Sequence, residues 1–574
     1  MDLILHDAQA SQWLEFTAPV EIVSTTKIED VQSCLDLLEN RIQEEKLYGA
    51  GFITYDAAPA FDDALVVHAA DRLPLVHFGL YESPNILTLP EISSNETAKL
   101  NWKSAVEFHQ YEDAIQKIKH RIAAGDTYQV NYTIRLNSTF SGNARDLFFE
   151  LVQGQEAEYA GFVDMETEAI CSISPELFFT FDNGILVSKP MKGTIPRGMT
   201  LNEDLRLKEV LSTSEKDRAE NVMIVDMIRN DMGRIADFGS VEVTSLYDVE
   251  KYPYVMQMTS TVKSRTQYSL SEVFKALFPC ASITGAPKVR TMEIIKNLEE
   301  TPRGIYTGSI GFITPEKRAQ FNVAIRTVTV DKTHQTAQYG VGGGIVWDSK
   351  VTDEYDECRT KSEVLYRKQT LFELFESIRW EKSAGFYLLA EHLERLTESA
   401  AYFDFPFNRN LALEKLENSI RNYPDQGAKV RFVLQKNGEM GALASSLRGV
   451  KSDNLNITLA ESPVNSKNRF LYHKTSCRQV YETAQQAYPQ ADEVILWNER
   501  NEITESCRAN VVVEIEGKRF TPPVQCGLLA GTYRRFLLET GEIEERVITV
   551  DDLKIAKNIY LINSVRKWMS THWI

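Results

Sequence analysis

The sequence predicts an α+β protein made of two successive modules. Its 574 residues exceed what a single hydrophobic core usually organises, and 43% hydrophobic with 25% charged residues is typical of a globular chain. Alternating helical and strand-like patterns run from about residue 20, and a second alternation begins after the glycine- and proline-free stretch YRKQTLFELFESIRW. We place the module boundary near residue 368 and expect domains over 1–100, 101–368 and 369–574, the first two belonging to one module.

Composition narrows the classes of function. The net charge of -18 would repel a nucleic-acid backbone, and the seven cysteines are scattered without any CxxC pair, which argues against a zinc site or a disulfide framework. No stretch approaches 18 consecutive apolar residues, and the first residues lack the pattern of a signal peptide. We expect a cytoplasmic protein without nucleic-acid or membrane partners.

The local patterns give the elements of the first module in order. Short strand-like runs and one helical stretch occupy about 20–100 and end in the polar segment LPEISSNETAK, which is typical of a connection. A helix follows over about 111–124, because apolar residues recur there at helical spacing and Gly125 stops the pattern.

A hairpin and two further helices complete that module. Asp182-Asn183-Gly184 separates LFFTF from ILVSKP, and an Asn-Gly pair tolerates the positive φ angles of a tight turn. This arrangement puts Lys192 just past the second strand, where its side chain could enter a cleft. Helical patterns cover about 215–232 and 353–365.

Six motifs in one order carry a family resemblance. They are SISPELFF, KPMKGTIPRG, DRAENVMIVDMIRNDMGRI, ITGAPKVRTMEII, FNVAIRT and YGVGGGIVWDSKVTDEYDE. From about residue 45 to 365 the chain resembles the chorismate-utilising enzymes, among them the large subunits of anthranilate synthase and aminodeoxychorismate synthase. The resemblance implies a sandwich of β-sheets with flanking helices, and chorismate as substrate.

Three glutamates are candidate metal ligands. Glu220 lies on one predicted helix, and Glu354 and Glu357 are three apart on another, so they share a face. Carboxylates without His or Cys companions suit a hard ion such as Mg²⁺, although an isolated helical glutamate is more often a solvated surface charge. The resemblance implies that Glu220 and Glu357 hold the Mg²⁺ that binds the ring carboxylate of chorismate.

The enolpyruvyl carboxylate of chorismate needs a second site. Arg326 offers a bidentate fork, and the Gly342-Gly343-Gly344 run could bring backbone N–H groups close to an anion because no Cβ intervenes. The resemblance also places Tyr306, Thr284 and Lys288 among the residues that line this pocket.

Two positions distinguish reactions within the family. Water-using relatives have a base lysine where this chain has Gln129, so ammonia is the expected nucleophile. Anthranilate synthases have alanine where this chain has Lys192, in PMKGT, and aminodeoxychorismate synthases have lysine there. A deprotonated lysine can add at C2 of chorismate until ammonia displaces it from C4, with Glu176 as general acid and base. Gln257, which replaces a histidine of the anthranilate synthases, also disfavours that reaction.

The ammonia must come from elsewhere, because the chain has no GxCxG nucleophile motif of a glutaminase. We expect a separate glutaminase subunit, or free ammonia as the donor.

The second module carries a different resemblance. FESIRW, EHLERLTESAAYF, YHKTSCR, EITESCRAN and LLAGTYRR resemble the fold-type IV pyridoxal-phosphate enzymes, a smaller α/β fold. The resemblance implies that Lys474 carries pyridoxal 5'-phosphate covalently, Glu505 pairs with its pyridine nitrogen, and Arg395 and Thr532 hold its phosphate. Dimerisation through this domain is also expected, since it is usual in that family.

Together the two resemblances imply synthesis of 4-aminobenzoate, a folate precursor, in two steps. Chorismate is aminated to aminodeoxychorismate, and pyruvate is then eliminated. Two alternatives remain open: an anthranilate-type synthase joined to an aminotransferase, and a synthase with an inert C-terminal scaffold domain. The shared chain favours the lyase, because aminodeoxychorismate is a sensible substrate for a neighbouring module and a branched-chain amino acid is not.

Overall fold

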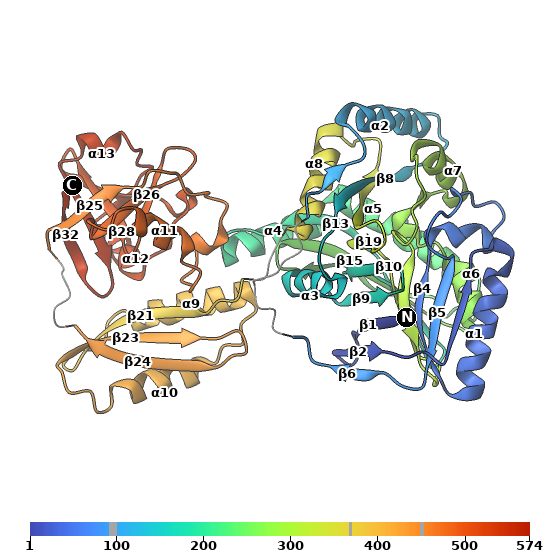
Figure 1. Ribbon diagram of the computed structural model, residues 1–574. Helices are drawn as coiled ribbons and strands as arrows, with labels where there is room; N and C mark the ends of the chain where they lie inside the picture. Colours follow the sequence, from blue (N-terminus) through green and yellow to red (C-terminus); the bar gives the residue numbers. More distant parts are fainter. Residues whose placement is uncertain (91–99, 156, 367–369, 448–452) are drawn as a thin grey trace. The chain divides into compact units, whose positions relative to one another are not determined.

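The computed structural model describes residues 1–90, 100–155, 157–366, 370–447 and 453–574 (Figure 1). They form two compact units, one of Met1–Pro196 with Glu209–Gln369 and one of Arg197–Lys208 with Thr370–Ile574. Most of the predicted connection LPEISSNETAK and the predicted boundary near residue 368 lie outside the described residues. Within the described ranges, no helix combines the length and the apolar character needed to cross a membrane.

The first unit is built on two antiparallel sheets of ten strands each. In spatial order, the first sheet contains β16 (Gly285–Ala286), β8 (Gln129–Thr139), β20 (Thr336–Ile345), β19 (Thr327–Asp331), β10 (Glu168–Ser174), β9 (Tyr159–Asp164), β1 (Asp2–Asp7), β2 (Gln12–Phe16) and β6 (Asn85–Leu87), with β7 (Lys103–Ser104) beside β8. The second contains β13 (Met191–Pro196), β15 (Val255–Arg265), β12 (Ile185–Lys189), β11 (Leu177–Asp182), β18 (Ala319–Asn322), β17 (Ser309–Ile313), β4 (Tyr48–Ile53), β5 (Val76–Tyr81) and β3 (Glu21–Thr25), with β14 (Glu242–Lys251) beside β15.

Apolar side chains hold these sheets together in layers. Leu3, Phe52 and Ile310, from both sheets, belong to one buried cluster between them. The helices that pack on the second sheet are α1 (Val31–Glu45), α5 (Glu215–Gly233) and α6 (Leu270–Leu277), and those on the first are α2 (Phe108–Ala123), α3 (Ala144–Gln155), α7 (Lys288–Leu298) and α8 (Val351–Ser362). Figure 1 shows α1 and α6 alongside β4 and β5. The predicted sandwich with flanking helices is confirmed.

The predicted local elements of this unit occur with small shifts at their ends. α2 begins with a capping box formed by Glu107 and Gln110, and Gly125 follows its end at a φ of 78°. Asn183 and Gly184 join β11 to β12 at φ angles of 50° and 76°, as the Asn-Gly signal predicts. Lys192 lies just past β12, as expected, but it also lies inside a further strand that was not predicted, β13, which pairs with the distant β15.

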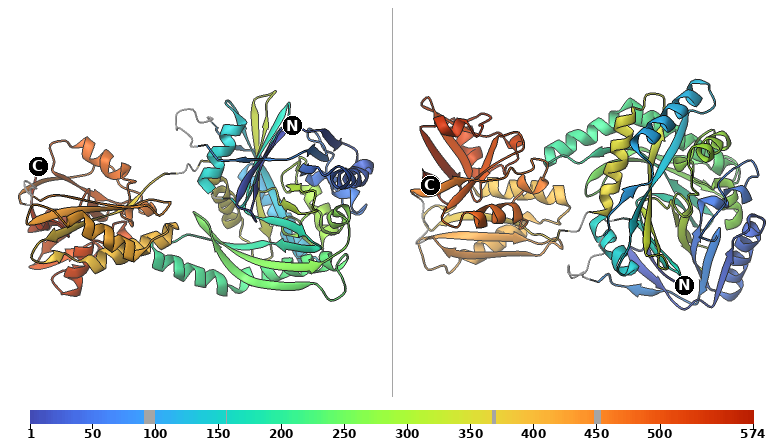
Figure 2. Two further views of the ribbon diagram at one scale, coloured as in Figure 1. Left: turned by 90° about the horizontal axis from the view of Figure 1, so that it is seen from below. Right: turned by 45° about the horizontal axis from the view of Figure 1, so that its top comes forward.

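The second unit contains a small sheet and a larger one. The four-stranded sheet has the order β22 (Gly385–Phe386), β21 (Leu374–Glu381), β23 (Gly427–Leu434) and β24 (Met440–Ser446), and α9 (Leu389–Phe403) and α10 (Arg409–Ile420) share a buried core with it. The eight-stranded sheet has the order β27 (Ile503–Ser506), β26 (Glu493–Trp497), β25 (Leu455–Leu459), β32 (Lys567–Trp573), β31 (Asn558–Asn563), β28 (Asn510–Ile515), β29 (Lys518–Thr521) and β30 (Glu544–Glu545). Two further views of these sheets are given in Figure 2.

Pairing of Glu505 in β27 with Asn510 in β28 closes six strands of the larger sheet into a ring. Its strand pairs are mixed, with β25 parallel to both β26 and β32. The remaining helices of this part of the unit are α11 (Gln479–Ala487), α12 (Thr532–Glu539) and α13 (Asp552–Ile555).

A short segment from the middle of the first module belongs to the second unit. It comprises Arg197–Lys208 and includes the start of α4 (Leu201–Thr213). Arg197 is buried, pairs with Asp204 at 2.5 Å and donates to the carbonyl of Tyr402 at 2.8 Å. The Tyr402 hydroxyl in turn donates to the carbonyl of Gly198 at 2.7 Å. The second unit is therefore discontinuous in sequence.

Candidate functional site

A cavity of about 380 Å³ in the first unit collects most of the predicted site residues. The predicted residues that line it are Glu176, Lys192, Glu220, Tyr306, Arg326, Gly342, Gly344, Glu354 and Glu357. They come from β13, β20, α5, α8 and the loops between strands. The fold therefore brings together side chains that are more than a hundred residues apart in the sequence.

Lys192 reaches this cavity from an irregular part of β13. The strand pairs with β15 at Met191 and again at Thr194, and the register shifts between the two pairs. Such irregularities redirect a side chain and are frequent next to active sites. Burial lowers the pKa of the Lys192 amine, against the opposing effect of the Glu220 carboxylate. The amine is consequently closer to its neutral, nucleophilic form than an exposed lysine is.

Glu176 lies on the same cavity, immediately before β11. Burial raises the pKa of its carboxyl group, although Ser282 and Lys192 both act to lower it. Its Oε1 has no hydrogen-bond partner among the described residues. A buried carboxyl group with a raised pKa and an open oxygen can hold a proton and pass it to a ligand.

Three more glutamates face the cavity from α5 and α8. Burial raises the pKa of Glu220 and of Glu354, and Glu354 accepts a hydrogen bond from Ser349 at 2.7 Å. Lys361 lowers the pKa of Glu357, to whose Oε1 its amine lies at 2.8 Å. The carboxylates therefore differ in proton affinity.

Within the described ranges, no three His, Cys, Asp or Glu side chains are close enough to form a metal-binding group. Mg²⁺ usually binds through one or two carboxylates together with water and substrate oxygens, and it does not need a cage made only of protein. The carboxylate oxygens of these glutamates are suitable ligands for such a partial site. The magnesium ion itself remains a prediction.

Glycines of β20 are required by the side chains packed against them. A Cβ on Gly344 would lie 2.0 Å from Nε2 of Gln129 and 3.2 Å from Nζ of Lys192. A Cβ on Gly340 would lie 2.3 Å from the ring of Tyr306. Contacts that short do not occur, so this strand can border the cavity only because these positions lack a side chain.

Arg326 lines the cavity from a strained backbone position. Its φ is 49°, in the left-handed region that residues other than glycine seldom adopt. Its carbonyl accepts a hydrogen bond from the amide of Ile173 at 3.1 Å, which ties this position to β10. Strain of this kind persists where the surroundings fix it, and it is frequent at ligand sites.

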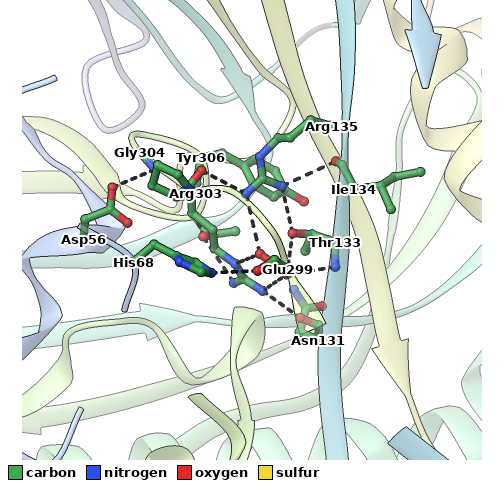
Figure 3. Close-up of polar contacts among 12 residues, drawn as sticks. Asp56, His68, Asn131, Thr133, Ile134, Arg135, Glu299, Arg303, Gly304 and Tyr306 are labelled. Carbon is green, nitrogen blue, oxygen red and sulfur yellow. Dashed lines mark hydrogen bonds and ion pairs between the residues drawn. The ribbon is translucent and has the colours of Figure 1, made fainter. Parts of the chain in front are cut away.

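A buried ionic network lies behind Tyr306, and Figure 3 shows it. Glu299 accepts hydrogen bonds from Arg303 at 2.8 Å and from the Thr133 hydroxyl at 2.7 Å. The guanidinium of Arg135 lies 5.2 Å from the centre of the Tyr306 ring. The Arg135 guanidinium of this network therefore packs against the Tyr306 ring, and neither Arg135 nor Glu299 lines the cavity.

The loop that carries Tyr306 is also held through its backbone. The amide of Gly304 donates to Asp56 at 3.0 Å, and Arg303 donates to the carbonyl of Asn131 at 2.8 Å (Figure 3). Burial raises the pKa of the Tyr306 hydroxyl to about 12, so this hydroxyl remains a hydrogen-bond donor at neutral pH.

A second cavity, of about 320 Å³, lies in the second unit. The predicted residues Arg395, Lys474, Glu505 and Thr532 all line it. Burial, and secondarily the charge of Arg395, lowers the pKa of the Lys474 amine to about 8. Its Nζ lies 4.8 Å from the centre of the Phe375 ring. This amine can be neutral near physiological pH, as attachment of an aldehyde cofactor requires.

Two hydrogen-bond donors fix Glu505 in the cavity that contains Lys474. It accepts from the Tyr481 hydroxyl at 2.7 Å and from the Leu529 amide at 3.2 Å. Burial raises the pKa of its carboxyl group to about 7. A carboxyl group held in this way fits beside the ring nitrogen of pyridoxal phosphate.

The carboxylate of Glu376 orients the guanidinium of Arg395. Its Nε and Nη2 donate to Glu376 at 2.9 Å and 2.6 Å, and its Nη1 donates to the carbonyl of Ala530 at 3.1 Å. The charge of Arg395 is the largest of the effects that lower the pKa of the buried Glu376 carboxyl, to about 2, against burial. The arginine is therefore held beside the start of α12.

The start of α12 has the chemistry of a phosphate site. Gly531 caps the helix, and a Cβ there would lie 2.0 Å from Oδ1 of Asn510. Thr532 is the first helical residue, with its hydroxyl 3.3 Å from Nε2 of His392. Helix-terminal amides, a hydroxyl and an arginine together suit a phosphate dianion, so these residues fit pyridoxal phosphate.

Comparison with known families agrees with this geometry. The family profile described as chorismate binding enzyme matches residues 2–367, more than half of the chain. The chain belongs to the chorismate binding enzyme family. A second profile, described as amino-transferase class IV, matches residues 373–573, so this chorismate binding enzyme also carries a class IV amino-transferase-like domain.

Individual relatives cover the first module. The chain is 40% identical over 267 residues to the aminodeoxychorismate synthase component 1 of Escherichia coli (strain K12), which is 46% of this chain and 58% of that protein. It is 38% identical over 269 residues to the anthranilate synthase component 1 of Aquifex aeolicus (strain VF5), which is 46% of this chain and 54% of that protein. The chain thus spans just over half the length of these relatives.

A solved structure resembles the same module. The crystal structure of anthranilate synthase component I from Streptococcus pneumoniae TIGR4 is 26% identical, with a TM-score of 0.54, and the likeness covers 61% of this chain and 91% of that one. This supports the fold of the first unit of our chorismate binding enzyme, and it does not choose between the two kinds of synthase.

Three predicted residues of this chorismate binding enzyme lie away from its cavity surface. Lys288 is the first residue of α7, where it donates to Asp231 at 2.9 Å and lines a separate cavity. Thr284 is buried, and its hydroxyl lies 3.3 Å from the carbonyl of Ala281. Gln129 packs beneath Gly344, as described above.

Several lining residues were missed by sequence reasoning, among them Lys361 and Ser282. Lys361 bridges the carbonyl of Gly342 at 2.9 Å and the carboxylate of Glu357 at 2.8 Å. Its position four residues after Glu357 on a predicted helix was an available signal, because such pairs meet on one face. Ser282 lines the cavity beside Glu176, and nothing in the local pattern marks it.

Proposed function

We propose that this chorismate binding enzyme makes 4-aminobenzoate in two steps. The first module replaces the C4 hydroxyl of chorismate by an amino group through Lys192, and the second releases pyruvate from the aminodeoxychorismate. The observation that carries the first step is the Lys192 amine, which lines the cavity with a lowered pKa, next to acidic side chains. The likeness to proteins named aminodeoxychorismate synthase component 1 supports the same reading.

In the first half of the amination, the neutral Nζ of Lys192 adds to C2 of chorismate. Both conjugated ring double bonds shift, through C1, C6 and C5, and the C4 hydroxyl leaves with a proton donated by Glu176, as water. The raised pKa of Glu176 suits this donor role, because its carboxyl group retains a proton at higher pH than an exposed glutamate does.

In the second half, ammonia adds at C4 and both ring double bonds shift back. The bond between C2 and Nζ breaks, its electron pair returns to Lys192, and the Glu176 carboxylate takes the proton that the incoming ammonia loses. Both residues are then restored to their starting states.

The two carboxylates of chorismate need separate partners. We assign the enolpyruvyl carboxylate to Arg326, the Tyr306 hydroxyl and the glycine-bordered edge of β20, which line one cavity. We assign the ring carboxylate to Mg²⁺, with Glu220 and Glu357 as protein ligands and Glu354 as a further candidate. The ion would neutralise charge at that carboxylate.

In the second module, bound pyridoxal phosphate would supply an electron sink for the substrate carbanion. Glu505 would hold a proton at the pyridine nitrogen, and Arg395, Thr532 and the amides at the start of α12 would bind the phosphate. The Nζ of Lys474 would take the proton from C4 of the substrate. Loss of pyruvate then leaves an aromatic ring.

The ammonia source, assembly and location stay predictions. The name component 1 of the relatives fits the expected separate glutaminase subunit, and we propose such a partner as the ammonia donor. A homodimer through the C-terminal domain and a cytoplasmic location are retained as expectations.

A synthase of the anthranilate type joined to an aminotransferase is the second candidate, since a relative of that name matches almost as well. Lys192 distinguishes the two, because amination at C2 needs no temporary nucleophile there. An inert C-terminal domain is disfavoured by the four cofactor-directed residues that line one cavity.

One incubation tests the proposal. The full chain, loaded with pyridoxal phosphate, is supplied with chorismate, Mg²⁺ and an ammonium salt, and the aromatic product is identified by mass and fluorescence. We expect 4-aminobenzoate and one pyruvate per product. Formation of the ortho isomer would overturn the assignment of the first module, and accumulation of aminodeoxychorismate that the loaded chain leaves intact would overturn that of the second.

A further inference from the structure

Apart from Arg395, Lys474 and Arg478, four further lysine and arginine side chains line the cavity that contains Lys474, and no cofactor role is assigned to them. They are Lys429 and Arg431 on β23, Arg508 in the turn between β27 and β28, and Arg566 in the turn between β31 and β32. We call these four residues the basic wall. The wall combines the four-stranded sheet with two turns of the eight-stranded sheet.

Strand register puts two wall residues on the cavity face of β23. Lys429 and Arg431 are two residues apart on β23 and therefore point to the same side of the sheet. Val430 and Phe432 point to the other side, where they are buried in the core with α9 and α10. Arg431 lies opposite Ser377 of β21, which also lines the cavity. An alternating K-x-R pattern thus presents both charges to the cavity.

One aromatic ring connects the wall to the reactive lysine. The Arg431 guanidinium carbon lies 4.2 Å from the centre of the Phe375 ring, and Nζ of Lys474 lies 4.8 Å from the same centre. Arg431 and Lys474 therefore pack against the same side chain in one cavity.

The turn that carries Arg566 is anchored to the four-stranded sheet. Arg379 of β21 donates to the carbonyl of Val565 at 2.9 Å, and the Ser564 hydroxyl donates to the carbonyl of Ser377 at 3.4 Å. These bonds hold the backbone of the turn in place, so its contribution to the wall does not depend on a ligand to form.

The wall has more positive charge than its surroundings neutralise. In the part of the chain that the structure describes, no carboxylate lies within ion-pairing distance of Lys429 or Arg431, and the nearest acid of Arg508 is Glu493 at 3.7 Å. Burial lowers the pKa of Lys429, and Arg431, Arg566 and Arg508 lower it further. In a chain with a net charge of -18, such a concentration of cations is a local exception that would attract an anion.

We propose that the basic wall binds a substrate carboxylate remote from the reacting amine, which makes the second module selective for dicarboxylates. This inference rests on the proposed lyase function. Aminodeoxychorismate has two carboxylates and an amine on a different carbon from either, whereas a branched-chain amino acid has one carboxylate, next to its amine. The wall thus selects the first substrate over the second.

Binding of two simple probes tests the wall without turnover. Isophthalate and benzoate differ by one carboxylate, and each is titrated into the cofactor-loaded full chain while the absorption band of the cofactor is recorded. We expect isophthalate to perturb the band with at least tenfold higher affinity than benzoate. In Arg431→Gln and in Lys429→Gln this preference should fall by about tenfold, the effect of roughly 1.4 kcal/mol at one charged contact.

Lys415→Gln is the matched control, since Lys415 is an exposed lysine of α10 in the same unit and does not line the cavity. It should retain the wild-type preference. Equal affinities of the two probes in the wild type, or an unchanged preference in both wall variants, would overturn the proposal.

Kinetics separate failure of the wall from failure of the lyase. With aminodeoxychorismate as substrate, Arg431→Gln and Lys429→Gln should raise KM for pyruvate release about tenfold and change kcat less than threefold, with cofactor content and melting temperature as in the wild type. A wild type that releases no pyruvate refutes the lyase function. A wild type that releases pyruvate, with KM unchanged in both variants, refutes only the wall.

Discussion

At the scale of single residues, the first step depends on the charge state of one amine. Burial lowers the pKa of Lys192, whereas the Glu357 carboxylate raises that of Lys361 on the same cavity against burial. Lys192→Ala should therefore lose formation of 4-aminobenzoate by at least a thousandfold, with any residual amination at C2. The aromatic products are to be separated and quantified by fluorescence.

Lys263→Ala is its control, because Lys263 is an exposed residue of the neighbouring strand β15 and does not line the cavity. It should behave as the wild type. If Lys192→Ala still produced the para isomer at a rate near that of the wild type, the covalent role of Lys192 would be excluded.

The second reactive lysine gives a pH prediction. The pKa of Lys474 is lowered to about 8, so the neutral fraction of its amine grows as pH rises and is nearly complete one unit above that value. The rate of cofactor attachment to the apo chain should rise up to about pH 9 and then level off. Stopped-flow absorbance measures the rate, and a rise that continued to pH 10.5 would mean that Lys474 titrates as an exposed lysine.

The sequence motifs identified functional residues, but they did not show which other side chains each of these residues contacts. Lys192, Glu220 and Glu357 stand in recognisable motifs, and all three line one cavity. Lys288 also stands in a motif, yet it points to Asp231 in a different cavity, because its direction depends on where α7 begins. A motif identifies the segment, while the orientation of each side chain is set by packing.

At the scale of elements, the glycines of β20 determine whether the first cavity exists. Gly344→Ala would bring a Cβ to 2.0 Å from Nε2 of Gln129 and to 3.2 Å from Lys192. Either Gln129 is displaced into the cavity or the strand moves away from β8, and the amination rate should fall by at least a hundredfold. The rate is measured together with melting temperature.

The matched substitution is Gly233→Ala at the end of α5, where an added Cβ meets nothing within 4 Å. That variant should keep its activity, and its stability should be equal or slightly higher because alanine favours helix. Full activity in Gly344→Ala would show that the close approach of β20 to Gln129 is not required.

Local elements were predictable because their causes are local. The Asn183-Gly184 turn and the capping box before α2 depend on neighbours within a few residues. The pairing of β8 with β20 joins Thr139 to Thr336, and no local pattern contains that information. For the same reason the sequence placed Lys192 correctly just past β12 but did not predict β13, whose pairing with the distant β15 extends the sheet around it.

At the scale of the whole molecule, the second unit depends on a segment from the middle of the first module. Arg197→Ala would leave the buried Asp204 without its ion-pair partner and remove a donor from the carbonyl of Tyr402. Breaking a buried pair in this way costs about 3–5 kcal/mol. We expect a lower unfolding temperature for the second unit, measured by calorimetry, and the double variant Arg197→Ala, Asp204→Ala should recover part of it.

The absorbance of the bound cofactor shows whether the second unit is the part that loses stability in Arg197→Ala. Loss of cofactor absorbance on heating reports the unfolding of the Lys474 site, and it should shift to lower temperature in Arg197→Ala. An unchanged loss temperature would mean that Arg197–Lys208 contributes nothing to that unit.

The discontinuity of the second unit constrains how this chain could be divided. The chain passes from one unit to the other after Pro196, after Lys208 and after Gln369. If the gene were split after Gln369, the C-terminal product would lack the Arg197–Lys208 segment. The N-terminal product would carry that segment without the unit in which it is folded. A division after Gln369 would therefore cost the second unit the contacts that Arg197 makes with the carbonyl of Tyr402.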